Sequence, residues 1–296
     1  MTKIDFHIHS NFSDGVLSPT QILERAKQNG VEALSISDHD SVDAYTKEFF
    51  DIAQSMNIKI VPAVEMSTKH FGVDVHVLGY GFDLSNKELE ECLNKLKNAR
   101  KNYLLDVSKK LADLGYCVNI SELSKLPSVT KAHISKDIVG NIKNHPLLIK
   151  NFGQMPSWGE FIETVMNEGC PAYTKKFSIS PIEAGKIIHT AGGKVVSAHP
   201  VAYAYEDGLS EQQVEQLAKE MKADGIEANY LYVDKFGNLI DETQKWNNFA
   251  KRLGLFVTCG SDFHSYDNIH PDIGFTNTTI HLSDEKQTEI VKNLSK

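Results

Sequence analysis

The chain has 296 residues, and 41% of them are hydrophobic, which is enough to form a large core in one domain or in a core domain with an insertion. Its net charge of −8 argues against nonspecific binding to duplex DNA, because that binding depends on a basic surface. No apolar run approaches the roughly 18–20 residues that a membrane span needs. The start of the chain also lacks the apolar run of a signal peptide, so we expect a cytoplasmic protein.

Strand-like apolar runs alternate with helical stretches along most of the chain. Strands are expected over residues 3–9, 33–37, 59–65, 73–80, 194–198, 225–229 and 255–260. Helices are expected over residues 19–29, 43–56, 181–191, 210–223 and 241–253. This repetition predicts an α/β fold with a largely parallel sheet.

The alternation breaks between residues 86 and 173. Helical periodicity over residues 87–114 is followed by a polar, less regular stretch in which strands are weak or absent. We interpret residues 86–173 as a mainly helical insertion that contributes to the substrate pocket. Residues 1–85 and 174–296 would then form the scaffold.

The first expected strand ends in two histidines, His7 and His9, that share one face because residues two apart in a strand point the same way. Two imidazoles on one face form a chelate for a borderline metal ion. A single pair of this kind is more often two ordinary polar side chains. Asp14 follows in a Ser-Asp-Gly turn, where an aspartate is common for conformational reasons alone.

The same residue types recur at or near the ends of the later strands. They are His39, Glu65, His76, His199, Asp262 and His264. The carboxyl ends of parallel strands meet at one edge, and sites are built there. Six histidines and three carboxylates are costly to bury unpaired, and a metal cluster offsets that cost. The set therefore predicts a metal centre.

At these residues the chain resembles the PHP family, named for polymerase and histidinol phosphatase domains. The resemblance implies a distorted (β/α)7 barrel that holds two or three divalent ions, and the ligand types suit Mn, Fe or Zn. It also implies an allocation, with one ion held by His7, His9, Glu65 and Asp262, a second by Glu65, His76 and His199, and a third by Asp14, His39 and His264. Asp38 and Asp40 would orient ligands from behind.

The expected insertion resembles a PHP subgroup of small phosphoesterases that act on nucleotides and carry an Arg-Pro-His-Ile motif. The corresponding residues here are Lys131-Ala132-His133-Ile134. Lys131 replaces an arginine, and a lysine cannot form the two parallel hydrogen bonds of a guanidinium to phosphate. The candidates for binding substrate phosphate are Lys131, His133 and Lys176. The pair Lys175-Lys176 is also typical of two ordinary solvent-exposed charges.

The resemblance implies hydrolysis of a phosphate ester, with Glu65, Asp262 and His199 as catalytic residues and His133 as an alternative proton donor. The expected substrate is a nucleoside 3',5'-bisphosphate or the end of a short oligonucleotide, and a histidinol-phosphate-type phosphomonoesterase is the alternative. A C–N amidohydrolase is less favoured, because no lysine stands at a strand end to bridge two ions. A noncatalytic metal domain is least favoured, because every expected ligand type is present.

The other histidines are expected to be structural, because they fall away from strand ends. They are His70, His145, His189, His270 and His281. The four cysteines form no C-x-x-C pair and are expected to be free thiols in a reducing compartment.

Overall fold

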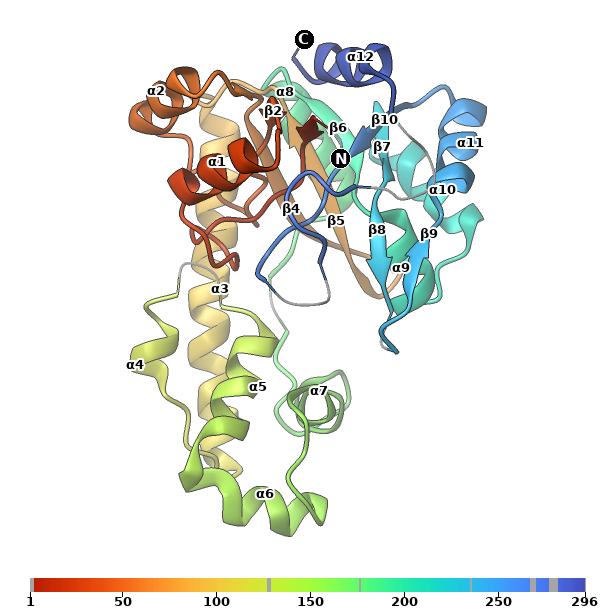
Figure 1. Cartoon of the computed structure of the whole chain (residues 1–296). Helices are drawn as coiled ribbons and strands as arrows, with labels where there is room; N and C mark the ends of the chain where they lie inside the picture. Colours follow the sequence, from red (N-terminus) through yellow and green to blue (C-terminus); the bar gives the residue numbers. More distant parts are fainter. Residues whose placement is uncertain are drawn as a thin grey trace. The chain divides into compact units, whose positions relative to one another are not determined.

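A computed structural model describes residues 3–126, 129–175, 177–234, 236–266, 270–276 and 282–295 (Figure 1). Contacts between residues divide the chain into two compact units. The first unit comprises Met1–Leu93 and Ile179–Lys296, and the second comprises Asn94–Ser178. The domain limits expected from the sequence stay a prediction.

The first unit contains a small parallel sheet with the order β1 (Ile4–Asp5), β2 (Ala33–Leu34), β3 (Lys59–Ile60). Helices α1 (Pro19–Gln28) and α2 (Lys47–Ser55) connect its strands. Ser18 caps α1, because its hydroxyl accepts from the Gln21 amide while the Gln21 side chain accepts from the Ser18 amide. The buried face of α1 packs into an apolar cluster with the side chains that flank β2.

A second, larger sheet has the order β10 (Phe256–Cys259), β7 (Gly225–Asn229), β6 (Lys194–Ser197), β5 (Val73–Tyr80), β4 (Ala63–His70). Strands β10, β7 and β6 run parallel, and β5 is antiparallel to both of its neighbours. Helices α8 (Pro181–Thr190), α10 (Glu211–Glu220) and α11 (Thr243–Leu253) connect or flank these strands (Figure 1). The predicted α/β fold is therefore confirmed.

The strands of the described residues do not form one closed barrel, so the expected (β/α)7 barrel is not confirmed. Single parallel bridges link the two sheets, one from Ile8 to Phe263 and one from His39 to Glu65. Pro62 separates β3 from β4, because proline has no amide hydrogen to continue a ladder. Glu65 consequently lies inside β4 and not at the end of the strand expected over residues 59–65.

Several elements of the first unit were not expected from the sequence. They are α9 (Pro200–Glu206), the hairpin of β8 (Leu231–Val233) and β9 (Leu239–Asp241), and α12 (Asp284–Leu294). Helix α2 also begins at Lys47, four residues later than expected, because Thr46 supplies the side-chain cap.

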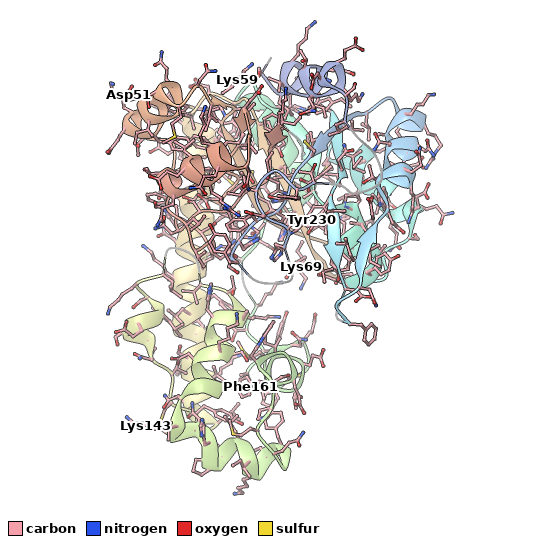
Figure 2. All side chains as sticks on the ribbon, in the orientation of Figure 1. Asp51, Lys59, Lys69, Lys143, Phe161 and Tyr230 are labelled. Carbon is pink, nitrogen blue, oxygen red and sulfur yellow. The ribbon has the colours of Figure 1, made fainter. Side chains whose placement is uncertain are left out.

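The secondary structure that is described in the second unit is all helical, and turns and loops connect the helices. Helix α3 (Lys87–Asp113) enters it from the first unit, and α4 (Ile120–Leu123), α5 (Lys131–Gly140), α6 (His145–Phe152) and α7 (Trp158–Phe161) follow, with short 3-10 and π turns over Ile142–Asn144 and Ile162–Met166. It has its own apolar core, which includes the fully buried Phe161 that is labelled in Figure 2. Within the described parts of the chain, no helix has the length and apolar character needed to cross a bilayer.

Candidate metal centre

His7 and His9 follow β1 and are fully buried. Their Nε2 atoms are 3.1 Å apart, so the two rings do share one face as the strand alternation predicts. Phe6 and Ile8 alternate with these histidines along the chain. Their side chains pack into apolar clusters, Phe6 into one and Ile8 into another, and not into the group of ligands. Local alternation therefore presents both imidazoles together.

Glu65 is the residue on which most of these histidines converge. Its side chain is 1% exposed. Oε1 lies 3.5 Å from His7 Nε2, 3.1 Å from His76 Nδ1 and 3.1 Å from His199 Nε2, and Oε2 lies 3.2 Å from His9 Nε2 and 3.0 Å from His39 Nδ1. His76 reaches this point from the first half of β5, because that strand runs against its neighbours.

Asp262 approaches the first two histidines from the segment after β10. Its Oδ1 atom lies 3.2 Å from His7 Nε2 and 3.1 Å from His9 Nε2. Its backbone has a φ of 53°, a left-handed conformation that aspartate tolerates better than most residues. Tyr230, which Figure 2 labels, donates its hydroxyl to the other carboxylate oxygen at 3.1 Å.

Asp14 joins a third set of rings. Its Oδ1 atom lies 3.4 Å from His264 Nε2 and 3.5 Å from His9 Nδ1, and Oδ2 lies 3.7 Å from His39 Nε2. The rings of His9 and His264 stack with centroids 4.0 Å apart. All nine residues expected as ligands therefore converge.

Their ligand atoms form overlapping groups whose members lie within 4.8 Å of one another. These are His7, His9 and Asp262; His39, Glu65 and His76; His9, Asp14, His39 and His264; and Asp262, His264 and His270. Three of these groups resemble the expected allocation in part. His9, His39, Asp262 and His264, however, each belong to two groups, so the allocation of ligands to single ions stays a prediction.

His270 is at this centre, so its expected place among the structural histidines is wrong. Its ring centroid is 4.6 Å from that of His264, and it lines the same cavity as the ligands. The sequence offers no strand or pairing signal for it, because it stands in a loop eight residues after Asp262. His281, also expected to be structural, lies outside the described residues.

Burial and mutual charge shift the pKa values of these groups in opposite directions. Although burial tends to raise the pKa of Glu65, the charges of His76, His39 and His7 hold it well below its usual range. Although burial tends to lower the pKa of His9, the adjacent carboxylates of Asp262 and Glu65 raise it to about 10. Burial outweighs the carboxylates at His39 and lowers its pKa to about 4.

The centre fits a metal cluster by its chemistry. Asp14 Oδ1 and Asp262 Oδ1 are buried and have no hydrogen-bond partner of good geometry within the described residues. Carboxylate oxygens and imidazole nitrogens are ligands that Mn, Fe and Zn accept. A bound cation would also offset the cost of burying several carboxylates together.

Asp38 and Asp40 lie behind the ligands, where the resemblance implied that they orient them. Asp38 accepts hydrogen bonds from the amide and hydroxyl of Ser10 at 2.7 and 2.6 Å and from the Ser13 hydroxyl at 2.5 Å. It thereby holds the loop between His9 and Asp14. Asp40 accepts a hydrogen bond at 2.8 Å from the backbone amide of Ser67, which lies in β4 two residues after Glu65.

Glu227 and Tyr230 also lie at the site, and neither was predicted from the sequence. Glu227 lies in β7, where an acidic residue within the short run Gly-Ile-Glu-Ala-Asn is the signal that could have revealed it. Tyr230 lines the cavity together with Ala202, Glu206, Tyr232 and Val233. No lysine or arginine is among the described residues that line this cavity.

The three candidates for binding substrate phosphate belong to, or border, the helical unit. Lys131 is the first residue of α5, and its Nζ donates to Asn167 Oδ1 at 3.0 Å. His133 completes the cap of α5, because its Nδ1 accepts from the Thr130 amide at 3.2 Å. Lys176 lies outside the described residues. A substrate role for all three stays a prediction.

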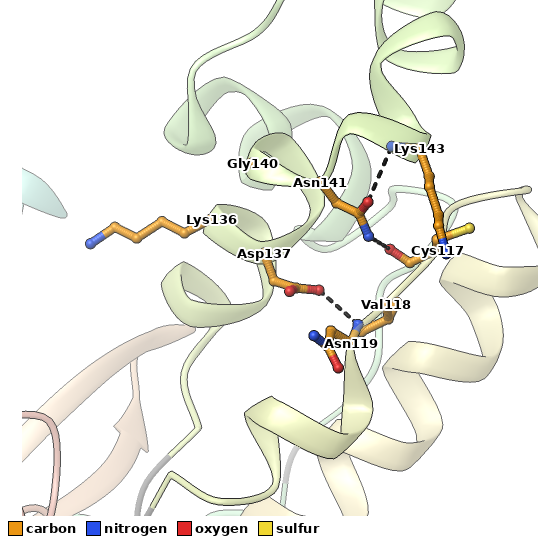
Figure 3. Close-up of a pocket in the computed structure, with 8 residues that line it drawn as sticks. All are labelled: Cys117, Val118, Asn119, Lys136, Asp137, Gly140, Asn141 and Lys143. Atoms are coloured by element: carbon orange, nitrogen blue, oxygen red, sulfur yellow. Dashed lines mark hydrogen bonds between the residues drawn. The ribbon is translucent and has the colours of Figure 1, made fainter.

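A separate hollow in the helical unit holds no comparable cluster (Figure 3). Its polar groups pair with one another: the Asn119 amide donates to Asp137 Oδ2 at 2.8 Å, and Asn141 Nδ2 donates to the Cys117 carbonyl at 3.4 Å. Such mutual pairing leaves this hollow without a convergent set of reactive groups.

The chain is similar to known proteins over most of its length. The sequence profile of the PHP domain matches residues 5–154. A 5'-3' exoribonuclease from Haemophilus influenzae is 30% identical over 88% of this chain and 90% of its own length. A 3',5'-nucleoside bisphosphate phosphatase from Chromobacterium violaceum is 26% identical over 93% of this chain and 92% of its own length.

Solved structures share the fold. A proposed metal-dependent phosphoesterase from Bifidobacterium adolescentis has a TM-score of 0.74 at 21% identity, covering 98% of this chain and 96% of that one. An amidohydrolase from Chromobacterium violaceum has the same TM-score at 24% identity, with the same coverage of both chains. At these identities the likeness supports the fold alone.

Proposed function

Because the chain belongs to the PHP domain family and is a metal-dependent phosphoesterase, we propose that it hydrolyses small phosphorylated nucleotides. The substrate class is a nucleoside 3',5'-bisphosphate or the phosphorylated end of a short oligonucleotide. The activities named for the two relatives support this class. We also propose a cytoplasmic location, on the basis of the four free cysteines, and no binding to duplex DNA, on the basis of the net charge of −8.

The convergence of ligand-type side chains at one cavity is the observation that carries the proposal. Three carboxylates and six imidazoles from segments far apart in the chain lie within hydrogen-bonding or ion-pairing distance of one another. A set of this kind is expensive to bury without cations. It is therefore hard to explain as structural polarity alone.

We propose that these nine residues hold two or three ions of Mn, Fe or Zn. When bound, such ions acidify a water molecule and offset the negative charge of the phosphate oxygens. Glu65 and Asp262 would hold the ions as catalytic carboxylates. Glu65 lies near rings from separate segments, those of His39 and His76, and Asp262 lies near His7 and His9. His199 is proposed as the proton donor to the leaving oxygen, with His133 as the alternative.

The described residues that line the cavity include no lysine or arginine side chain. A second phosphate group on the substrate therefore needs cationic partners from elsewhere. We propose Lys131, His133 and Lys176 for that role. Lys131 is a point charge, so it is expected to attract phosphate without the geometric selectivity of an arginine.

Two other reactions remain as alternatives. A histidinol-phosphate-type phosphomonoesterase would use the same ions and a substrate with one phosphate group. A C–N amidohydrolase would commonly add a lysine that bridges two ions, and the described cavity residues include no lysine. The phosphoesterase is favoured over the amidohydrolase on this ground.

The test is a substrate panel with the full chain and added Mn²⁺, with and without a chelator. The panel contains nucleoside 3',5'-bisphosphates, a 5'-phosphorylated oligoribonucleotide, histidinol phosphate and a set of amides. Chelator-sensitive phosphate release from the nucleotides is expected to exceed release from histidinol phosphate. Turnover of an amide without phosphate release would contradict the proposal.

A further inference from the structure

Strand β7 contributes none of the nine expected ligands, although it lies between two strands that lead into ligands. Its neighbour β6 leads into His199, and its neighbour β10 leads into Asp262. What β7 supplies at this position is Glu227, a carboxylate that is only 1% exposed. A carboxylate buried so completely requires partners, because an unpaired one would be strongly destabilising.

Among the described residues, Glu227 has two hydrogen-bonding partners, and both are expected metal ligands. Its oxygens lie 3.0 and 3.1 Å from His7 Nδ1, and Oε2 accepts from the His199 amide at 2.9 Å. The carboxylate therefore connects the segment after β1 with the segment after β6. It faces the side of the His7 ring that points away from the centre.

The two nitrogens of His7 consequently have different partners. Nε2 lies 3.1 Å from His9 Nε2 and 3.2 Å from Asp262 Oδ1, whereas Nδ1 faces Glu227. A carboxylate only accepts hydrogen bonds, so the proton of a neutral His7 must be on Nδ1. The lone pair of Nε2 is then directed at the cluster of ligands.

Gly260 keeps this pair of side chains in place. A Cβ at residue 260 would overlap the Cβ of His7 and Oε1 of Glu227, so the bare backbone packs directly against both. Neither side chain has room to turn towards Gly260. The contact between Glu227 and His7 is thus held by packing as well as by hydrogen bonds.

We propose that Glu227 is a positioning residue for the metal centre. It holds His7 with its proton on Nδ1 and fixes the backbone at His199, so that ligands from two separate segments are presented together. The inference rests on the metal centre of the proposed function and is independent of the substrate. Partners of this kind typically change metal affinity by about 10–100-fold when they are removed.

Glu227→Gln is the sharpest variant, because it keeps the shape of the side chain and removes its charge. The amide carries N–H donors, so it no longer forces the His7 proton onto Nδ1. Some molecules would then have an N–H at Nε2, where the metal ion must bind. We expect weaker metal binding with little change in the stability of the metal-free fold.

Asp224→Asn is the matched control. Asp224 also contacts a histidine and accepts from a backbone amide, with Oδ2 lying 2.8 Å from His189 Nε2 and 2.9 Å from the Val195 amide. Neither His189 nor Val195 is an expected ligand. A general effect of removing a carboxylate next to an imidazole would appear in this control as well.

The experiment titrates each metal-free protein with Mn²⁺ alone and measures free Mn²⁺ by electron paramagnetic resonance. Thermal unfolding of the metal-free proteins is recorded in parallel. Glu227→Gln is expected to bind Mn²⁺ about 10–100-fold more weakly, with Asp224→Asn unchanged. Wild-type affinity in Glu227→Gln, or an equal loss in Asp224→Asn, overturns the proposal.

A second measurement does not depend on how well the variant folds. Nitrogen NMR of zinc-loaded wild-type protein with labelled histidine reports which His7 nitrogen carries the proton. A protonated Nδ1 with Nε2 bound to zinc is expected, and the opposite assignment overturns the proposal. Neither measurement uses a substrate, so failure of the phosphoesterase panel and failure of this inference remain distinguishable.

Discussion

The metal centre and the start of helix α5 both contain histidines and charged side chains, yet their residues have different local environments. At the centre, the groups near Glu65 come from segments far apart in the chain and have few local partners. At α5, Lys131 contacts Asn167, and His133 bonds to Thr130 three residues away. Long-range convergence of costly groups is strong support for a site, whereas a local partner already accounts for a polar side chain.

The largest expected effect at the centre is that of Glu65→Gln. This change removes the charge that five imidazoles share, so we expect kcat/KM for the substrate to fall about 10³-fold, which corresponds to about 4 kcal/mol. Steady-state kinetics with saturating Mn²⁺ measures the change. The fold should persist, because the new side chain has the same shape.

Glu220→Gln is the control for this variant. Glu220 also pairs with a histidine, His70, at 2.9 Å, but the pair lies apart from the ligand groups. Its kcat/KM should match that of the wild type. Full activity in Glu65→Gln would remove Glu65 from the catalytic residues.

Removal of metal should change hydrogen exchange in the first unit more than in the second. This effect is expected to be smaller than that of Glu65→Gln. A ligand at 100 times its Kd stabilises the state that binds it by about 2.7 kcal/mol. Hydrogen exchange should therefore speed up on chelation in β4 and in residues 256–266, while α5 and α6 change little. Equal acceleration in both units would mean that the ions do not act locally at the centre.

The sequence predicted that the nine side chains converge, mainly from two rules about strands, while their role as metal ligands stays a prediction. Alternation along a strand placed His7 beside His9, and the edge rule for parallel strands placed His199 near Asp262. What escaped prediction depended on contacts across the sheet or within loops. Glu227 is an ordinary acidic residue until β7 is placed next to β6, and His270 has no strand to orient it.

The same limit applies to the fold. The strand limits of β5 and β7 were predicted without error, because their apolar runs are bounded by polar or turn residues. The antiparallel direction of β5 was not predicted, because the turn at Phe71 and Gly72 replaces a helical connection. Strand direction depends on the length and backbone angles of a connection more than on the strand's own sequence.

Gly260→Ala tests packing at the centre against packing in the helical unit. The added methyl group would overlap His7 and Glu227, so we expect a loss of about 2 kcal/mol in the free energy of unfolding and weaker Mn²⁺ binding. Chemical denaturation and a metal titration measure the two effects. Gly140→Ala in α5 is the control, since a methyl group there would meet nothing within 4 Å. A Gly260→Ala protein as stable as the Gly140→Ala protein would contradict close packing of Gly260 against His7 and Glu227.

The smallest expected effect is at Lys131, where the local partner competes with the proposed role in binding phosphate. Lys131→Ala removes one cation and one hydrogen bond to Asn167, so we expect KM for a nucleoside 3',5'-bisphosphate to rise about tenfold, which corresponds to about 1.4 kcal/mol. Lys136→Ala, on the same helix, is the control, because Lys136 lies over the Trp158 ring with its Nζ 5.2 Å from the centroid. A substrate role requires that KM rise more for the bisphosphate than for a monophosphate. An unchanged KM in Lys131→Ala would mean that Lys131 has only a structural role, through its hydrogen bond to Asn167. The residues that act on the substrate would then all lie at the metal centre, and none at the start of α5.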